Sequence, residues 1–143
     1  MNKNMFAVLM TLFIVFVGLQ FAEPATAAKV VDHGTKYVWS GQDNAWMKIT
    51  WTAYQYQYKK NCKINNNFLK IYRTGYIKNP KTKKYVYQSD DTFTLTKVGK
   101  NSVKITCKSK PDELGPGTSV EYRKTKLTAA QYYWRVFKHE ITA

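Results

Sequence analysis

Alternation of apolar and polar residues with a period of two recurs along the chain and is typical of β-strands. It is clearest over residues 46–58, where apolar side chains occupy the odd positions of the first half. Tyr54, Tyr56 and Tyr58 then fall on the even positions. Either both faces of this strand are partly covered, or a β-bulge near Ala53 exchanges its two faces.

Shorter segments of the same kind follow, separated by residues that favour turns. The expected strands cover residues 36–39, 46–58, 68–78, 84–88, 93–98, 103–108 and 120–126. The expected turns and loops cover residues 40–44, 65–67, 79–82, 89–91, 99–101 and 111–117. Gly75 is expected to disturb the strand that contains it.

The last segment combines two conflicting signals. Thr128 and Gln131 have the spacing of a helix capping box. Residues 132–141 are rich in aromatic and β-branched side chains, which favours a strand. We expect one short turn of helix at most, followed by a final strand. About seven or eight short strands then predict an all-β fold, a small antiparallel β-sandwich or barrel in a single domain.

The first 27 residues have the order of a secretory signal peptide. One charge, Lys3, precedes an uncharged apolar run over residues 6–17, and a proline and the small residues 25–27 follow. This order predicts cleavage after Ala27, or one residue later, and secretion of a mature domain of residues 28–143. The alternative is an uncleaved membrane anchor, but the apolar stretch is shorter than the ~20 residues that a spanning helix needs.

Cys62 and Cys107 both belong to the expected mature domain. Secretion favours oxidation of thiols, so we expect one intramolecular disulfide between them. Such a bond would stabilise the fold by roughly 4 kcal/mol, less any strain. The alternatives are free thiols or an intermolecular bridge. Neither cysteine has a second cysteine or a histidine at ligand spacing, so no metal site is expected.

Charge is the strongest functional signal. The 143 residues carry 23 Lys and Arg against 9 Asp and Glu, a formal net charge of +14, and this excess lies wholly after residue 27. Solubility needs a net charge of only about two to eight, so the excess predicts an anionic partner. Candidate polyanion-binding residues are Lys59, Lys60, Lys63, Lys78, Lys81, Lys83, Lys84, Arg123, Lys124 and Lys126.

Most of these basic residues fall at predicted strand ends or turns, where their side chains could merge into one field. For any single cluster the alternative is protection of sheet edges against aggregation. Lysine dominates the basic residues, whereas reading of bases prefers arginine. The composition therefore favours diffuse attraction to a polyanionic surface over sequence-specific recognition of nucleic acid.

Tyrosine is the second functional signal, with 11 tyrosines in the chain. A tyrosine-rich face beside lysines could stack sugars or bases, or lie at a membrane interface. The alternative is an ordinary half-covered sheet face, since tyrosine favours strands. The candidate aromatic face comprises Tyr54, Tyr56, Tyr58, Tyr85 and Tyr87. The four tryptophans, Trp39, Trp46, Trp51 and Trp134, are expected in the core.

Signals for catalysis are weak, and no cofactor is expected. His33 and His139 lie near the two ends of the mature domain, and chain ends often lie close together. They could form an acid–base pair for RNA cleavage, with Glu121 or Glu140 as carboxylate and Arg123 or Arg135 as phosphate clamp. The alternative is two exposed histidines without a role. Nucleophile elbows, phosphate loops and calcium loops are absent from the sequence.

Three function classes follow. The first is a secreted, non-enzymatic basic protein that binds anionic cell-surface polymers or anionic membranes, one version of which is antimicrobial or competitor-directed. The second is an extracellular inhibitor or immunity-type protein that docks on an acidic protein partner. The third is a small secreted ribonuclease.

Overall fold

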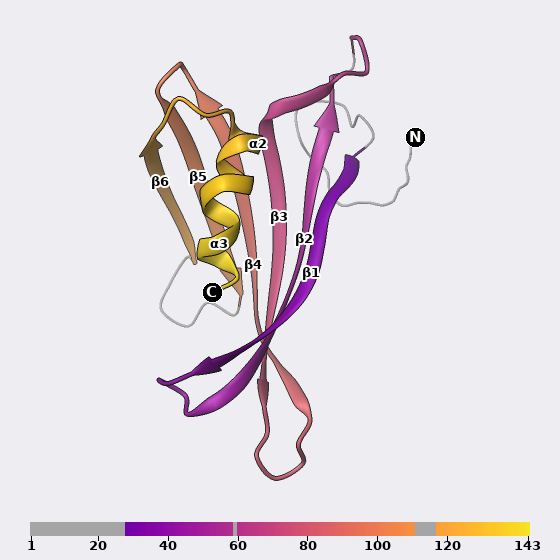
Figure 1. Ribbon diagram of the computed structural model, residues 1–143, viewed down its shortest axis with the longest axis vertical. Helices are drawn as coiled ribbons and strands as arrows, with labels where there is room; N and C mark the ends of the chain where they lie inside the picture. Colours follow the sequence, from indigo (N-terminus) through magenta and orange to yellow (C-terminus); the bar gives the residue numbers. More distant parts are fainter. Residues whose placement is uncertain (1–27, 59, 111–116) are drawn as a thin grey trace.

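Six antiparallel strands form one sheet in the computed structural model, which describes residues 28–58, 60–110 and 117–143 (Figure 1). Each strand pairs with its sequence neighbours, so β1 and β6 form the two edges. The strands are β1 (Ala28–Ser40), β2 (Ala45–Gln57), β3 (Ile64–Lys78), β4 (Tyr85–Val98), β5 (Ser102–Lys110) and β6 (Thr118–Lys124). The expected all-β antiparallel fold is confirmed, but one sheet replaces the predicted sandwich or barrel. The predicted signal peptide lies outside the described residues.

The C-terminal segment forms a helix that covers one face of the sheet (Figure 1). It runs through α2 (Ala129–Tyr132), a π-helical turn η2 (Tyr133–Phe137) and α3 (Lys138–Ile141). Thr128 and Gln131 form the predicted capping box, with Oγ1 of Thr128 accepting from the Gln131 backbone at 3.1 Å. The predicted final strand is wrong, because a helical turn buries Tyr132, Tyr133 and Phe137 against the sheet.

The core lies between this helix and the odd-numbered residues of the central strands, because successive side chains of a strand point to opposite faces. The strands contribute Ile49, Trp51, Ala53, Leu69, Ile71, Phe93, Leu95, Val103 and Ile105. The helix contributes Ala129, Ala130, Tyr132, Tyr133, Phe137 and Ile141. The face toward the helix is called the covered face below, and the opposite face is called the open face.

The pattern in residues 46–58 resolves in favour of two partly covered faces. Gln55 is buried like Ala53 before it, so β2 keeps its parity to the end. No register shift occurs at Ala53 itself: the β1–β2 register shifts between Val30 and Asp32, and the β2–β3 register shifts between Gln55 and Gln57, near the end of β2. At Gly75 the β3–β4 register shifts between Gly75 and Tyr76, but the extra residue, Gln88, lies in β4, and β3 itself continues through Gly75.

The strand count is six because two predicted strands are one. Residues 84–88 and 93–98 belong to β4, which passes without a turn through the predicted turn at 89–91. Asp91 lies on the covered face, where it accepts hydrogen bonds from Arg73 Nε at 3.0 Å and from Ser109 Oγ at 2.6 Å. Asp90 accepts from Thr74 Oγ1 at 2.7 Å. Cross-strand partners thus satisfy two residues whose local preference is for a turn.

The second turn that was wrong is 65–67, which lies within the start of β3. The chain turns earlier, where the Cys62 amide donates to the Tyr58 carbonyl at 2.8 Å. Gln55 then fixes the beginning of β3, since its Nε2 donates to the Asn65 carbonyl at 3.1 Å and to Asn66 Oδ1 at 3.3 Å.

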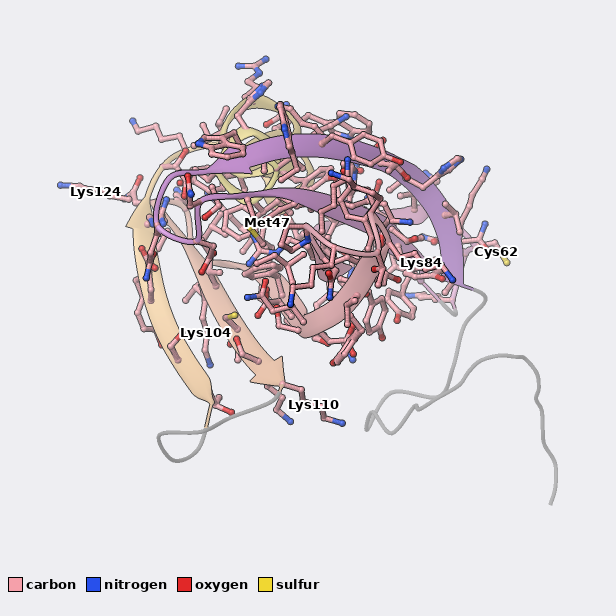
Figure 2. The ribbon with its side chains drawn as sticks, turned by 90° about the horizontal axis from the view of Figure 1, so that it is seen from below. Met47, Cys62, Lys84, Lys104, Lys110 and Lys124 are labelled. Carbon is pink, nitrogen blue, oxygen red and sulfur yellow. The ribbon has the colours of Figure 1, made fainter. Side chains whose placement is uncertain are left out.

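The predicted disulfide is not formed, and both cysteines are free. Cys62 is exposed in the turn between β2 and β3, whereas Cys107 pairs with Phe93 within β5. Because β4 lies between β3 and β5, the two positions are separated by at least two strand spacings, about 10 Å. A disulfide needs Cα atoms within roughly 7 Å. Figure 2 shows Cys62 on the other side of the molecule from Lys104 of β5.

Asp32 connects the edge strand β1 to the helix. Its carboxylate accepts hydrogen bonds from Tyr133 Oη at 2.7 Å and from Trp51 Nε1 at 3.2 Å, and it forms an ion pair with Lys138 Nζ at 3.0 Å. Burial works against the ionised carboxylate, but these three donors outweigh it and lower the pKa of Asp32. The Trp51 ring lies directly over Gly34, so a side chain has no room there.

Arg73 makes the matching connection on the other side of the helix. Its Nε and Nη2 donate to Asp91, and its Nη1 donates to the Ile141 carbonyl at 2.8 Å. The guanidinium also lies 5.0 Å from the centre of the Phe93 ring.

No helix of the described residues is long and apolar enough to span a membrane.

The two long hairpins extend beyond the helix and diverge at their ends (Figure 1). The β2–β3 ladder stops at the pair Met47–Ile77. The β1–β2 ladder continues to Ser40–Ala45, and the β3–β4 ladder begins at Lys78–Tyr85. Beyond the Met47–Ile77 pair the two hairpins no longer pair with each other, and the helix does not reach them (Figure 1). Side chains on both faces of these strand ends are therefore accessible.

Candidate functional site

The open face is lined by aromatic, threonine and lysine side chains. The strand register places there the even-numbered residues of β2, β3, β5 and β6, together with the odd-numbered residues of β1 from His33 to Trp39. In β4 the shift opposite Gly75 and Tyr76 places Tyr87 on the open face together with Asp90. One uninterrupted face therefore extends from the tip of β1 and β2 to β6.

A tyrosine cluster occupies the β2–β3 part of the open face. The rings of Tyr54 and Tyr72 meet edge to face at 5.6 Å, and Tyr56 meets Phe68 at 5.5 Å. Burial raises the pKa of Tyr56 and of Tyr72, with a smaller contribution from Tyr54. The rings of the cluster thus cover one another only in part, and Tyr72 remains 40% exposed.

Lysines flank this cluster on the side of β4 and β5. Lys70 and Lys108 lie on the open face on either side of β4, opposite Thr94 and Thr92. Burial lowers the pKa of Lys70, and the positive charge of Lys108 lowers it further. Lys104 and Lys110 of β5 are labelled in Figure 2 and share this parity. A negative group above these side chains would relieve their mutual repulsion.

The ion pairs of the described residues lie on the covered face or on the helix. Asp32 pairs with Lys138, Asp91 pairs with Arg73, and both Glu121 and Glu140 pair with Arg123. Asp90 is the one acidic side chain that the strand register places on the open face of the described strands, and it accepts hydrogen bonds from Thr74 and Tyr87. The acidic side chains that the structure describes on the covered face and the helix are therefore all bound to cations, whereas the open face keeps an excess of positive charge.

Lysines and aromatic side chains, the two functional signals of the sequence, occur together at the ends of the diverging hairpins. We call these ends the hairpin-end surface. It comprises Tyr37, Trp39, Trp46, Lys48, Tyr76, Lys78, Lys81, Lys83, Lys84, Tyr85, Val86 and Tyr87. Trp39 and Trp46 are 52% and 45% exposed, in contrast to 9% for Trp51 in the core. An exposed cluster of large apolar side chains is typical of an interaction site.

Aromatic rings and lysines alternate across this surface. Lys48 Nζ lies 4.8 Å from the centre of the Tyr76 ring, and Lys78 Nζ lies 5.9 Å from that of Tyr85. Tyr37 packs against Tyr85 at 5.5 Å, and Trp39 packs against Trp46 at 5.7 Å. The lysine heads are held beside ring faces, where they keep their charge close to apolar surface.

An ordered turn presents the remaining lysines. Asn79 Oδ1 accepts from the backbone amides of Lys81 at 2.8 Å and Thr82 at 3.1 Å. The Lys83 amide donates to the Asn79 carbonyl at 2.8 Å. Lys81, Lys83 and Lys84 are all exposed. The turn predicted at residues 79–82 is confirmed, and it fixes the backbone that carries a dense group of positive charges.

A groove opens between the two diverging hairpin ends. Its volume is about 540 Å³. One wall comes from the β1–β2 hairpin and contains Trp39, Asp43 and Trp46. The other wall comes from the β3–β4 hairpin, and its residues are Ile77, Lys78, Asn79, Pro80, Lys83 and Val86.

The predicted basic residues do not merge into a single patch. Lys78, Lys81, Lys83 and Lys84 gather at the hairpin end, whereas Lys60 and Lys63 lie in the turn at the opposite end of β2 and β3. Lys124 ends β6, on the far side of the molecule from Cys62 (Figure 2), and Lys126 follows two residues later. Lys59 lies outside the described residues.

Arg123 differs from the predicted lysines because its guanidinium is already bound. Nε donates to Glu121, Nη1 donates to Glu140 at 2.9 Å, and Nη1 also donates to Tyr132 Oη at 2.8 Å. These carboxylates raise the pKa of Arg123, with Glu140 contributing most. Arg123 fastens the helix to β6.

The predicted aromatic face divides into two groups on the same open face. Tyr54 and Tyr56 belong to the tyrosine cluster, whereas Tyr85 and Tyr87 belong to the hairpin-end surface. Tyr58 lies past the end of β2, where its hydroxyl donates to Asn65 Oδ1 at 2.9 Å and so holds the β2–β3 turn.

The two histidines are not brought together. His33 pairs with Thr52 on the open face, and His139 belongs to α3, which lies against the covered face. Glu140 and Arg123 bind each other. The predicted acid–base pair therefore has no common site. No group of three or more metal-ligating side chains occurs among the described residues.

Sequence reasoning missed Trp39, Trp46, Asp43 and Lys48 as members of the site. A signal was present in the sequence: Trp46 is five residues from the buried Trp51, an odd separation that puts the two rings on opposite faces of one strand. Trp39 and Trp46 also flank the turn predicted at residues 40–44, which makes them a cross-strand pair.

Comparisons of this chain with protein-family models, with curated proteins and with solved structures find no match.

Proposed function

We propose that this protein is a secreted, non-enzymatic basic protein that binds anionic polymers on cell surfaces through its hairpin-end surface. The observation that carries the proposal is the interleaving of exposed aromatic rings with Lys48, Lys78, Lys81, Lys83 and Lys84 at one end of the sheet. Secretion rests on the signal-peptide pattern of residues 1–27.

Charge placement supports this proposal over a purely solubilising role for the lysines. Lysines that only protect against aggregation would be scattered over sheet edges. Here Lys81, Lys83 and Lys84 share one rigid turn, although their mutual repulsion opposes that arrangement. A polyanion that binds along the turn neutralises this repulsion and releases its own counterions, so binding should weaken steeply with salt.

Lysine rather than arginine at this surface favours a flexible polyanion over a defined planar group. Lysine is a point charge on a long flexible stem, and it does not impose bidentate geometry. Repeating phosphates of a cell-wall polymer match this tolerance. The open face continues the positive surface toward Lys70 and Lys108, which gives a long polymer a path across the sheet.

The test is retention of residues 28–143 on an immobilised phosphate-rich wall polymer and on anionic vesicles, each measured across a salt titration. We expect the logarithm of the binding constant for the polymer to fall linearly with the logarithm of salt concentration. The triple variant Lys81→Gln/Lys83→Gln/Lys84→Gln should lower the magnitude of that slope by roughly 0.7–0.9 for each lysine that contacts the polymer.

A matched control removes the same charge elsewhere. The triple variant Lys60→Gln/Lys63→Gln/Lys124→Gln has the same net charge as the hairpin variant but leaves the hairpin-end surface intact. Equal loss of retention in both triple variants would reject the hairpin-end surface as the site. Retention on vesicles but not on polymer would replace the wall polymer with a membrane, and retention on neither would reject the proposed function.

A further inference from the structure

We infer that the groove between the hairpin ends is a subsite for one phosphate-bearing sugar unit. This inference rests on the proposed function and specifies the chemistry of the polymer unit that the hairpin end takes. The volume of about 540 Å³ lies within the ordinary range for small-ligand sites, roughly 300–1,000 Å³. The groove is therefore large enough for a single sugar ring with its phosphate.

The wall from the β1–β2 hairpin suits the apolar side of a sugar ring. Trp39 and Trp46 meet edge to face, with an angle of 74° between the rings, so the two indoles present differently oriented surfaces. The ring C–H groups of a pyranose carry slight positive charge and pack against the negative face of an indole. Both tryptophans are about half exposed, so their contact with each other leaves surface for a ligand.

The same wall carries a carboxylate that selects hydroxyl groups. Asp43 Oδ2 accepts one hydrogen bond from Ser40 Oγ at 2.9 Å. An ionised carboxylate has room for about four acceptor contacts, so it can accept further bonds from sugar hydroxyls. A bare anion would be repelled by Asp43, whereas a polyol next to it gains charge-assisted hydrogen bonds.

The opposite wall carries the cations. Lys78 and Lys83 line the groove on the β3–β4 side, and Pro80 and Asn79 fix the turn between them. The two walls therefore have opposite charge, with hydroxyl acceptors on one side and phosphate partners on the other. Arginine, which binds carboxylates through two parallel bonds, is absent from this lining. A sugar phosphate fits this charge asymmetry better than a uronic acid or inorganic phosphate.

The test uses the monomeric probe glucose 1-phosphate, with inorganic phosphate and free glucose as comparisons. The indole N–H signals of the four tryptophans are followed by NMR during each titration. We expect glucose 1-phosphate to shift the Trp39 and Trp46 signals at concentrations at least tenfold below those needed for either comparison probe. The Trp51 and Trp134 signals should stay in place, because both rings lie away from the groove.

Two pairs of variants locate the binding. Trp46→Ala should weaken glucose 1-phosphate binding at least tenfold, whereas Trp134→Ala removes an exposed indole from the helix and should leave it unchanged. Lys83→Gln should weaken it, whereas Lys81→Gln changes a lysine of the same turn that does not line the groove. Asp43→Asn should reduce, at least threefold, the ratio of the affinity for glucose 1-phosphate to the affinity for inorganic phosphate.

Failure of the subsite is distinguishable from failure of the proposed function. If glucose 1-phosphate binds no better than inorganic phosphate, or shifts Trp134 as much as Trp46, the subsite is rejected even where polymer retention persists. If Trp46→Ala abolishes the shifts but also unfolds the protein, the surface variant Asp43→Asn decides, and an unchanged preference in that variant overturns the inference. Loss of polymer retention with persistent glucose 1-phosphate binding rejects the proposed function alone.

Discussion

The covered region around Asp32 and the hairpin-end groove both contain tryptophan, lysine and aspartate side chains. These side chains bind one another in the covered region, whereas they are accessible in the groove. Under the helix, Trp51, Tyr133 and Lys138 all bind the Asp32 carboxylate. In the groove, the tryptophans, lysines and Asp43 face one another across an open space. The comparison teaches that coverage by the helix, rather than residue type, decides whether this chemistry stabilises the fold or is available to a ligand.

The largest expected effect comes from removing the centre of the covered region. Asp32→Ala leaves Lys138 and the Tyr133 hydroxyl without their partner and should lower the free energy of unfolding by about 3 kcal/mol. The matched change in the groove, Asp43→Ala, removes an exposed carboxylate and should cost less than about 1 kcal/mol. Urea denaturation of both variants measures the contrast, and equal costs would contradict it.

A second variant tests how closely the covered face is packed. A β-carbon on Gly34 would lie 2.5 Å from the Trp51 ring, so Gly34→Ala must displace that ring and weaken its bond to Asp32. We expect a loss of about 1–3 kcal/mol in the free energy of unfolding. Gly41, with open space around its α-carbon, is the control. Unchanged stability in Gly34→Ala would show that Trp51 has room to move.

Acidification should reveal the Asp32 network by a smaller effect. The pKa of Asp32 in the folded protein lies below its ordinary value of 3.8, so its ionised form stabilises the fold. This contribution is complete above the unfolded-state pKa and is lost as the pH falls through the folded-state pKa. The free energy of unfolding should be measured from about pH 6 to about pH 2. As the pH is lowered, it should fall less steeply in Asp32→Asn than in the native chain. Parallel curves would contradict the prediction.

The smallest expected effect separates the exposed cysteine from the half-buried one. Because no disulfide is formed, Cys62→Ser should change the free energy of unfolding by less than about 0.5 kcal/mol, not the roughly 4 kcal/mol that a disulfide would contribute. Burial also raises the pKa of the Cys107 thiol. An alkylating reagent at pH 8 should therefore label Cys62 first, which peptide mapping over time would show.

Much of the sheet was predictable because local signals and tertiary contacts agree there. The alternation in residues 46–58 and the turn at 79–82 each depend on neighbours within a few residues. The capping box of Thr128 is equally local, and it is present as predicted. Positions with strong local preference and no competing partner are those that sequence reasoning identifies correctly.

The errors fall where distant partners override local preference. Asp90 and Asp91 favour a turn by themselves, but Thr74 and Arg73 on the neighbouring strand satisfy them within β4. The aromatic residues after Thr128 favour a strand in isolation, yet a helix buries Tyr132, Tyr133 and Phe137 against the covered face. The disulfide between Cys62 and Cys107 was predicted from secretion alone. Secretion favours oxidation of thiols, but it does not show how far apart the fold places two cysteines.

The residue types of the candidate site could be predicted from the sequence, but the positions of these residues in the fold could not. Lysines and tyrosines were identified as its members, yet their division between the hairpin end, the tyrosine cluster and the β2–β3 turn follows from strand register. Arg123 appears in the sequence like any other basic residue, and only the position of Glu140 on the helix shows that it is bound. All four tryptophans were expected in the core because tryptophan is usually buried, and this is correct for Trp51 but wrong for Trp39, Trp46 and Trp134, which are about half exposed.

The bond between Tyr133 and Asp32 joins residues 101 positions apart, whereas every strand pairs with its neighbour in sequence. Contacts between near neighbours in sequence form faster than contacts between distant residues, so we expect the hairpins to assemble before the helix docks. Substitutions such as Tyr133→Phe should then mainly speed unfolding and leave the rate of hairpin assembly almost unchanged. In that order of events, the bond between Tyr133 and Asp32 contributes to the lifetime of the folded state rather than to the speed of folding.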